Sequence, residues 1–221
     1  KGSRLRLVME TDGSLSLIAS KKSNVRNPDD LKGKNISVSG NTFVEYATDE
    51  VMKRACLHPG EVNKPEINNI PLRLMMLEDG QISASFLPGP ATAIALNNGH
   101  TALLNTRQMG LRCTGIVFSE KAITEKDEEI RRFITGYNLG VKYLQTRPQN
   151  EWTEILVKEF GLQEKAAMQI DLPDYRPATR PSYHDIEKII AWLKSKGAIP
   201  DYYPGENLVD TTFIPGTLKP Q

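Results

Sequence analysis

The chain has 221 residues, and its 28 Lys and Arg side chains nearly balance 27 Asp and Glu side chains. This length can bury a substantial core in one domain or in two lobes. The net charge is only +1, so the chain lacks the excess of basic residues expected of a protein that binds nucleic acid or an anionic membrane. Charged residues interrupt every apolar run well before the roughly 20 residues that a transmembrane helix needs.

The first half of the chain alternates predicted strands and helices with short connections. Apolar alternation predicts strands over 4–10 and 15–19, and a helical turn begins at Asn27-Pro28. A strand over 36–38 and a helix from Thr42 follow. Further strands are expected over 67–70, 82–87 and 100–105, and helices over 72–79 and 91–98. This order predicts a compact α/β unit with a parallel sheet.

The second half is dominated by amphipathic helices. A strand is expected over 114–118, before helices over 127–145, 151–160 and 183–196. Ile130, Ile134 and Val141 recur at helical spacing and predict one buried face. The acidic residues at 127–129 sit in a first helical turn, where they complement the helix dipole and need no catalytic role.

The most informative local stretch is the turn at Gly40. Ile36 and Val38 alternate as in a strand, Gly40 allows a sharp reversal, and Thr42 can cap the next helix. Glu45 stands three residues after Thr42, so the pair fits a capping box. Such a helix start can hold a carboxylate, sulfonate, phosphate or polar neutral group. An ordinary strand–Gly–helix turn is the competing interpretation.

No catalytic, metal or cofactor motif accompanies this turn. The chain lacks a nucleophile elbow, a zinc motif, a Walker loop and a dinucleotide fingerprint. Three polar or Gly/Pro turns remain that could converge, and they are Asp12-Gly13-Ser14, Ser39-Gly40-Asn41-Thr42-Phe43 and Pro88-Gly89-Pro90. Because none brings a group for proton transfer, they indicate binding rather than turnover. We therefore expect no catalytic residue, no metal and no cofactor.

The cysteines and histidines give no stronger signal. Cys56 and Cys113 are expected to be buried free thiols, although the sequence leaves a disulfide between them open. His58, His100 and His184 are scattered, and surface loops are the expected place for each.

Four motifs in the same order resemble one family. The first is Asn27-Pro28-Asp29-Asp30-Leu31-Lys32-Gly33-Lys34, followed by Ile36-Ser37-Val38-Ser39-Gly40-Asn41-Thr42. The second and third are the segment 74–80 and Phe86-Leu87-Pro88-Gly89-Pro90-Ala91-Thr92-Ala93. The fourth is Trp192 to Gly197 with Leu208-Val209-Asp210 and Phe213-Ile214-Pro215. Over nearly the whole chain this resembles ABC-importer substrate-binding proteins of the aliphatic-sulfonate, nitrate and thiamine-pyrimidine type.

The resemblance implies a type II periplasmic-binding-protein fold, with two α/β lobes joined by a hinge. Residues 1–15 would be a remnant of lobe one with the first hinge strand, and 16–112 would form lobe two. Residues 113–221 would supply the second hinge strand and the C-terminal helices of lobe one. The N-terminal half of lobe one is then expected to be missing from this chain.

The resemblance also implies an extracytoplasmic receptor of an ABC importer, which captures a small polar or anionic solute of the sulfonate, nitrate or thiamine-precursor type in a cleft between the lobes. The receptor would deliver this solute to a membrane permease and its ATPase. The receptor would be a monomer in the periplasm or on the extracellular face, with a lipid anchor as one option. Solute contacts are implied at Asp12, Gly13, Ser14, Asn41, Thr42, Phe43, Pro88, Gly89 and Pro90, beside Ser39 and Gly40. Many relatives have Glu where Gly89 stands. The alternatives are an enzyme similar to fungal thiamine-pyrimidine synthases and a cytoplasmic effector-sensing domain.

Overall fold

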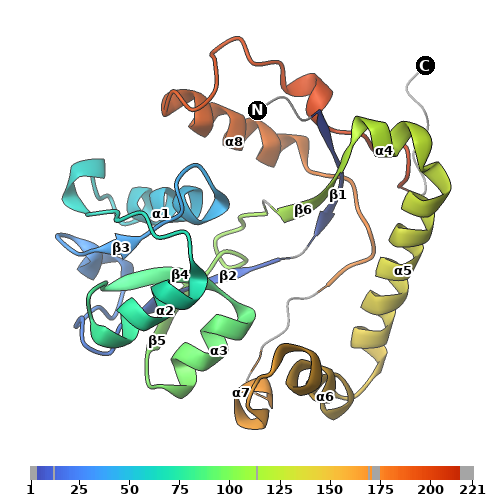
Figure 1. Cartoon of the computed structure of the whole chain (residues 1–221). Coiled ribbons are helices and arrows are strands. Elements are labelled where there is room, and N and C mark those ends of the chain that lie inside the picture. The colour runs from blue at the N-terminus through green and yellow to red at the C-terminus, as the bar shows by residue number, and fades with distance from the viewer. Residues whose placement is uncertain (1–3, 12, 113, 169, 171–174, 215–221) are drawn as a thin grey trace. The chain divides into compact units, whose positions relative to one another are not determined.

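The computed structural model describes residues 4–11, 13–112, 114–168, 170 and 175–214. The chain folds into two α/β units (Figure 1). Unit 1 comprises Lys1–Gly13, Arg112–Pro148 and Pro173–Gln221, and unit 2 comprises Ser14–Leu111 and Gln149–Leu172. None of the helices in the described ranges is both long and apolar enough to cross a membrane.

Unit 2 is built on a four-stranded sheet with the strand order β3-β4-β2-β5. Its elements in chain order are β2 (Leu15–Ala19), the 3-10 turn η1 (Pro28–Leu31), β3 (Ile36–Ser37), α1 (Phe43–Arg54), the 3-10 turn η2 (Pro59–Glu61), α2 (Ile70–Asp79), β4 (Ala84–Pro88), α3 (Gly89–Asn97), β5 (Thr101–Asn105), α6 (Gln149–Phe160) and α7 (Glu164–Met168). As expected, η1 starts directly after Asn27 and α1 directly after Thr42. Each of these residues caps its helix, because its side-chain oxygen accepts a hydrogen bond from a backbone N–H group of the first turn.

The sheet is mixed, so the prediction of a parallel sheet is wrong in part. Only β3 and β4 pair in parallel, whereas β2 pairs antiparallel with both β4 and β5. The strands β3, β4 and β5 therefore run in one direction, as the alternation with helices predicted. The antiparallel β2 inserts between β4 and β5 and supplies both with ladder hydrogen bonds.

Helices cover both faces of this sheet. Ile18 and Leu87 pack in one apolar cluster with Leu77 of α2 and Ala91 and Ala95 of α3. Successive strand residues point to opposite faces. Leu17 and Phe86, which lie opposite each other in the register and are buried, therefore point to the other face, where Figure 1 shows α1.

The predicted strand over 67–70 is absent, because residues 63–67 form only isolated bridges along the outer edge of β3. Val38 donates its N–H to the carbonyl of Pro65, but Pro65 has no N–H to return, so no regular ladder develops. Helix α2 then begins earlier than predicted. Asn69 caps it by accepting the N–H of Leu72, and Pro71 occupies the first turn.

Helices α6 and α7 pack within unit 2, whereas residues 149–172 were assigned to lobe one from the sequence. The cause is an apolar cluster in which Ala93 of α3 meets Leu162, Ala167 and Ile170. The small Ala93 side chain, only 2% exposed, allows the close approach of these residues to α3.

Unit 1 is organised around the antiparallel pair of β1 (Leu5–Thr11) and β6 (Thr114–Ser119). Its helices are α4 (Glu120–Glu125), α5 (Asp127–Thr146) and α8 (Tyr183–Ser195), with the 3-10 turn η3 (Gly205–Leu208). Val8 and Met9 of β1 are fully buried and pack against Ile130 and Ile134 of α5. This contact is the buried helix face that the apolar spacing predicted.

The carboxylate of Glu10 ties distant segments of unit 1 together. Its side chain accepts the backbone N–H of Ser182 at 3.2 Å and lies 3.4 Å from Arg176 and 3.9 Å from Arg112. The backbone N–H of Glu10 also donates to the carbonyl of Thr179. A buried carboxylate needs such partners because burial removes its hydration.

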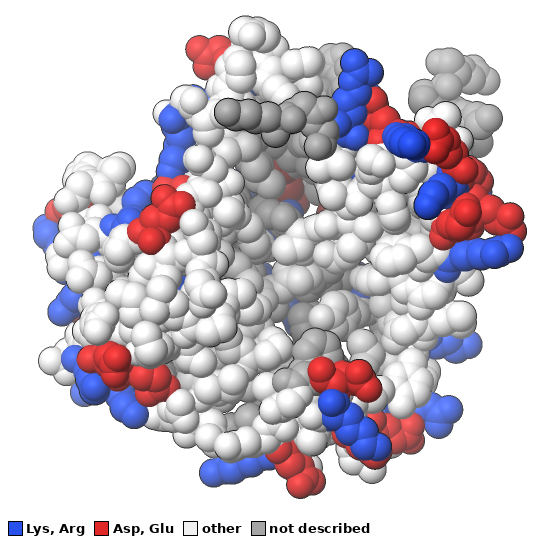
Figure 2. All heavy atoms as spheres, viewed as in Figure 1, with Lys and Arg blue, Asp and Glu red and all other residues white. Residues whose placement is uncertain are grey.

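Charged side chains of both signs lie next to one another in Figure 2, mostly towards the rim of the face in view. On α5, Asp127 pairs with Arg131 and Glu128 pairs with Arg132, each four residues apart. These exposed pairs contribute little stability. They agree with the expectation that the acidic cluster at 127–129 is structural.

The expectation that His100 lies in a surface loop is wrong. The ring is buried, and its Nδ1 accepts the backbone N–H of Lys21 at 3.1 Å. Its Nε2 lies 3.0 Å from Glu78 Oε2, without the alignment of a good hydrogen bond. Asn98 donates a further hydrogen bond to Glu78. These contacts join the ends of β2, α2 and α3.

Replacing Leu77 tests the core of unit 2. Leu77 is fully buried, so Leu77→Ala should lower the free energy of unfolding by about 2–5 kcal/mol. Met75 lies on the same helix but is 54% exposed, so Met75→Ala should change it by less than about 0.5 kcal/mol. Urea unfolding of both variants measures the difference, and equal losses would contradict this packing.

Acid should weaken the contacts of Glu78. Partial burial acts to raise the pKa of Glu78, but contacts with Asn98, His100 and Lys21 outweigh it and hold this pKa below its ordinary value of 4.5. The stabilisation is therefore present above pH 4.5 and is lost as the pH falls through the lowered pKa. The difference in unfolding free energy between the unaltered protein and Glu78→Gln should shrink on acidification. A difference that grows towards low pH would refute this assignment.

Candidate functional site

Two of the polar turns and the start of β2 lie at the same end of the sheet in unit 2. The parallel pairing of Ser37 with Ser85 makes β3 and β4 end at the same edge, just before the turns at Gly40 and Gly89. The antiparallel pairing of Leu15 with Pro88 places the start of β2 there too, directly after Ser14. Ligands of open α/β sheets bind at such strand ends.

The turn at Gly40 is held by local hydrogen bonds. The carbonyl of Ser39 accepts from the N–H and the hydroxyl of Thr42, and Asn41 adopts a left-handed conformation with φ of 55°. Thr42 Oγ1 accepts the N–H of Val44 at 3.3 Å. Asn and Gly tolerate this geometry better than other residues, which explains the local sequence.

The predicted capping box between Thr42 and Glu45 is wrong in its partners. Thr42 caps the N–H of Val44 rather than that of Glu45, and Glu45 Oε2 accepts the N–H of Asn41 at 2.8 Å. The reciprocal pair is therefore displaced by one residue on each side. Glu45 is buried and lies 3.7 Å from Lys64.

Carboxylates also shape the charge of this turn. A Cβ atom at Gly40 would lie 3.0 Å from a carboxylate oxygen of Glu66. The carboxylates of Glu45 and Glu66 therefore lie near the positive end of the α1 dipole and partly compensate it. Asn41 and Thr42 are exposed and Phe43 is half-buried, so their side chains remain available to a solute.

The turn at Gly89 has a different character. Helix α3 begins here without a side-chain cap at Pro88, and its first turn carries no acidic residue. Pro90 lacks an N–H, and a Cβ at Gly89 would meet no atom within 4 Å. Thr92 Oγ1 donates to the carbonyl of Leu87 at 3.1 Å. This helix start is open, whereas that of α1 carries its own caps.

The remaining turn is divided. Asp12 lies outside the described residues, Gly13 belongs to unit 1, and Ser14 belongs to unit 2. A Cβ at Gly13 would lie 2.9 Å from Thr114 Oγ1. Glycine is therefore required there by the close approach of Thr114, whose hydroxyl donates to the carbonyl of Thr11.

Sequence reasoning missed Arg73, which braces the ends of β3 and β4 from α2. Its side chain donates from Nε to the carbonyl of Ile67 (2.9 Å), from Nη1 to the carbonyl of Phe86 (3.1 Å) and from Nη2 to Ser39 Oγ (2.8 Å). Arg73 is 2% exposed, and burial lowers the pKa of its guanidinium. The available signal was a single cation within an otherwise apolar helical stretch.

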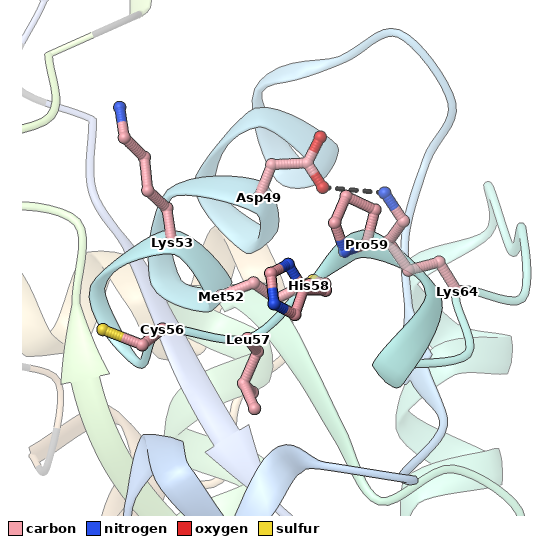
Figure 3. A pocket seen from close by; sticks show the side chains of 8 residues that line it. All are labelled: Asp49, Met52, Lys53, Cys56, Leu57, His58, Pro59 and Lys64. Carbon is pink, nitrogen blue, oxygen red and sulfur yellow. Dashed lines mark hydrogen bonds and ion pairs between the residues drawn. The ribbon is translucent and has the colours of Figure 1, made fainter.

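A separate hollow of about 550 Å³ lies at the other end of α1. Figure 3 shows its lining, where Asp49 and Lys64 form an ion pair at 2.7 Å and the Cys56 thiol points away from them. Cys56 is exposed and free, so the expectation of a buried thiol is wrong. Cys113 lies outside the described residues. His58 is exposed here as expected, and His184 is exposed on α8 rather than in a loop.

Within the described part of the chain, no three or more His, Cys, Asp or Glu side chains are grouped to hold a metal ion. The chemistry of the candidate edge is therefore that of hydroxyls, amides and backbone N–H groups, with Glu66 beside them.

The comparison with family models decides the family. The model described as NMT1/THI5 like matches residues 10–151. The chain belongs to the NMT1/THI5-like family. This match runs from the end of β1 to the start of α6 and includes all three turns. No curated protein sequence matches the chain significantly.

Solved structures share the fold of this NMT1/THI5-like protein. An alkanesulfonate-binding protein SsuA from Xanthomonas axonopodis pv. citri, bound to MOPS, has a TM-score of 0.73 and 18% identity, covering 95% of this chain and 71% of its own. A ligand-binding component of an ABC-type import system from Staphylococcus aureus, with zinc bound, has a TM-score of 0.75 and 12% identity, with coverage of 96% and 74%. The desulfurization enzyme DSZB has a TM-score of 0.66 and 12% identity, with coverage of 96% and 78%.

These identities establish the fold alone. The predicted periplasmic-binding-protein fold is confirmed, since an alkanesulfonate-binding protein and a ligand-binding component of an import system each match nearly the whole NMT1/THI5-like chain. The likeness to a desulfurization enzyme shows that the same fold also carries catalysis in another protein.

Thiol labelling tests the placement of Cys56. Because its side chain is exposed and unpaired, Cys56 should react with a thiol reagent in the folded protein without added reductant. Mass spectrometry of the labelled peptides identifies the modified residue, and Cys56→Ser should lose that label. Labelling of Cys56 only after unfolding would show that the thiol is buried.

Proposed function

We propose that this protein is an extracytoplasmic receptor of an ABC importer, which binds a small polar or anionic solute and delivers it to a membrane permease. The observation that carries the proposal is that the turns at Gly40 and Gly89 and the start of β2 lie at the same end of the sheet in unit 2. Family membership and the fold shared with import binding proteins support the same function.

In this proposal the solute contacts lie in the three turns. Ser39, Gly40, Asn41, Thr42 and Phe43 contribute from the start of α1, and Pro88, Gly89 and Pro90 contribute from the start of α3. Ser14 adds the beginning of β2, and Asp12 and Gly13 extend this set along the hinge segment.

A conformational change on binding would follow from differential affinity. A solute shifts the population of the receptor towards the conformation that binds it more tightly. The permease would then distinguish the loaded from the empty receptor. We further propose a monomer that works with a permease and an ATPase, in the periplasm or on the extracellular face, with or without a lipid anchor.

Binding without turnover is supported by the chemistry of the turns. Hydroxyls, an amide and backbone N–H groups can hold a polar solute, but a general acid–base pair is not among the candidate contacts. The enzyme alternative rests on the shared fold of the desulfurization enzyme. An effector-sensing domain is the other alternative, and both predict a different fate or use of the bound solute.

A solute screen tests the proposal. Ethanesulfonate, nitrate and the hydroxymethyl aminopyrimidine precursor of thiamine would be added separately during thermal unfolding. At 100 times its Kd, a solute stabilises the folded protein by about 2.7 kcal/mol, which should raise Tm by several degrees. Native mass spectrometry should then recover that solute unchanged, whereas a product of altered mass would support the enzyme.

A Thr42 variant locates the site. Thr42→Trp places a bulky side chain at the α1 start and should abolish the thermal shift, while loss of the cap costs about 1 kcal/mol of stability. Thr124 is an exposed threonine of α4, and Thr124→Trp is the matched control that should bind normally. Undiminished affinity in Thr42→Trp would remove the α1 start from the site.

A further inference from the structure

We propose that Arg73 is a positioning residue of the solute site, which holds Ser39 so that the Ser39 hydroxyl donates its hydrogen to an acceptor atom of the solute. The inference rests on the proposed receptor function. It adds a residue that the turns alone do not reveal, and it specifies the group that the solute presents at this edge.

Arg73 is a buried cation whose three hydrogen-bond partners among the described residues are all neutral. No carboxylate of the described residues lies within 4.0 Å of its guanidinium, although the side chain is only 2% exposed. Burying a charge is costly, and a well-packed apolar side chain often serves stability as well or better. Apolar packing alone therefore does not account for an arginine at this position, whose side chain is held by the hydrogen bonds that it donates.

The fork of Arg73 reaches the segments that lead into two of the turns. Phe86 stands two residues before Pro88, and Ser39 stands directly before Gly40. Bonds of 3.1 Å to the Phe86 carbonyl and 2.8 Å to Ser39 Oγ fix these segments relative to α2. The planar guanidinium presents its donors in a rigid geometry that a lysine does not reproduce.

Ser39 differs from the other buried serines of unit 2. Ser37 donates to Ser85 Oγ at 2.8 Å, and Ser20 donates to the carbonyl of Leu77 at 2.8 Å. Ser39 Oγ accepts from Arg73, but no acceptor among the described residues takes its hydrogen. A hydroxyl has one donor and can also accept, so Ser39 keeps a donor for a group outside the protein.

The bond from Arg73 also strengthens that donor. A hydroxyl that accepts a hydrogen bond from a cation becomes a better donor, because successive hydrogen bonds polarise one another. Ser39 is 8% exposed, so its oxygen has little access to water. A sulfonate or nitrate oxygen or a ring nitrogen of the solute would fit this donor.

The Glu66 carboxylate restricts where an acceptor atom of the solute can lie at the Gly40 turn. Its carboxylate lies beside Gly40 and is exposed, so it disfavours negative charge on that side of the turn. Lys64 compensates Glu45 and Asp49 in part, at 3.7 and 2.7 Å. The acceptor atom of the solute is therefore expected at Ser39, on the side braced by Arg73, and not beside Glu66.

A double-mutant cycle on affinity tests the inference. Titration calorimetry with ethanesulfonate, nitrate and the aminopyrimidine would compare the unaltered protein, Ser39→Ala, Arg73→Lys and the double variant. Loss of one hydrogen bond should weaken Kd by about 3- to 10-fold in Ser39→Ala. Arg73→Lys should weaken Kd to a similar degree, and the double variant should be no weaker than the weaker single variant.

Control variants separate this role from stability. Ser20 is buried and hydrogen-bonded at the opposite edge of the sheet, so Ser20→Ala should lower Tm without changing Kd. Ser39→Thr keeps the hydroxyl and should retain binding, so the test stands even where Arg73→Lys does not fold.

The outcomes distinguish two failures. Unchanged affinity in Ser39→Ala, or losses that multiply in the double variant, would overturn the inference while leaving the receptor function intact. If the unaltered protein binds none of the three solutes, the proposed function fails and this inference fails with it.

Discussion

Unit 2 depends on the complete burial of strand β4. Residues Ala84 to Leu87 are essentially inaccessible, so their backbone groups must find partners within the protein. The strands β3 and β2 supply them along the two edges, but β3 pairs only as far as Ser37. Beyond that point Arg73 takes the carbonyl of Phe86. The end of β4 is therefore held in place just before the turn at Pro88 and Gly89. This fixes the position of that turn in the candidate site.

Local sequence predicted most elements but not the way they assemble. Strand β2 and the caps at Asn27 and Ser182 follow from neighbours in the sequence. The direction of β2 within the sheet depends on pairing with strands far along the chain, which periodicity does not encode. A strand was predicted over residues 67–70 because a short apolar run can belong to a strand or to a helix. In the structure, Pro65 interrupts the hydrogen-bond ladder and Asn69 caps helix α2, so no strand forms there.

The turns of the candidate site could be predicted from the sequence, but the long-range hydrogen bonds that hold them in place could not. Gly, Pro and Asn mark the turns at Gly40 and Gly89, because these residue types punctuate a chain. Arg73 acts on Ser39 across a separation of 34 residues, and no short pattern reports such a contact. The buried His100 was missed for the same reason, since its partner Lys21 lies 79 residues away.

The two units are interleaved along the chain, since each contains segments from both halves. Glu10 pairs with Thr179, and Leu7 pairs with Val209. The strand β1 therefore pairs with residues that are synthesised about 170 to 200 residues after it. During synthesis the sheet of unit 2 can close once residue 111 has emerged, whereas β1 then still lacks these partners. Unit 1 is consequently a late folding event with high sequence separation, which slows folding and leaves strand edges exposed meanwhile. Proteolytic cleavage of the chain at a single site would not release either unit as one continuous fragment.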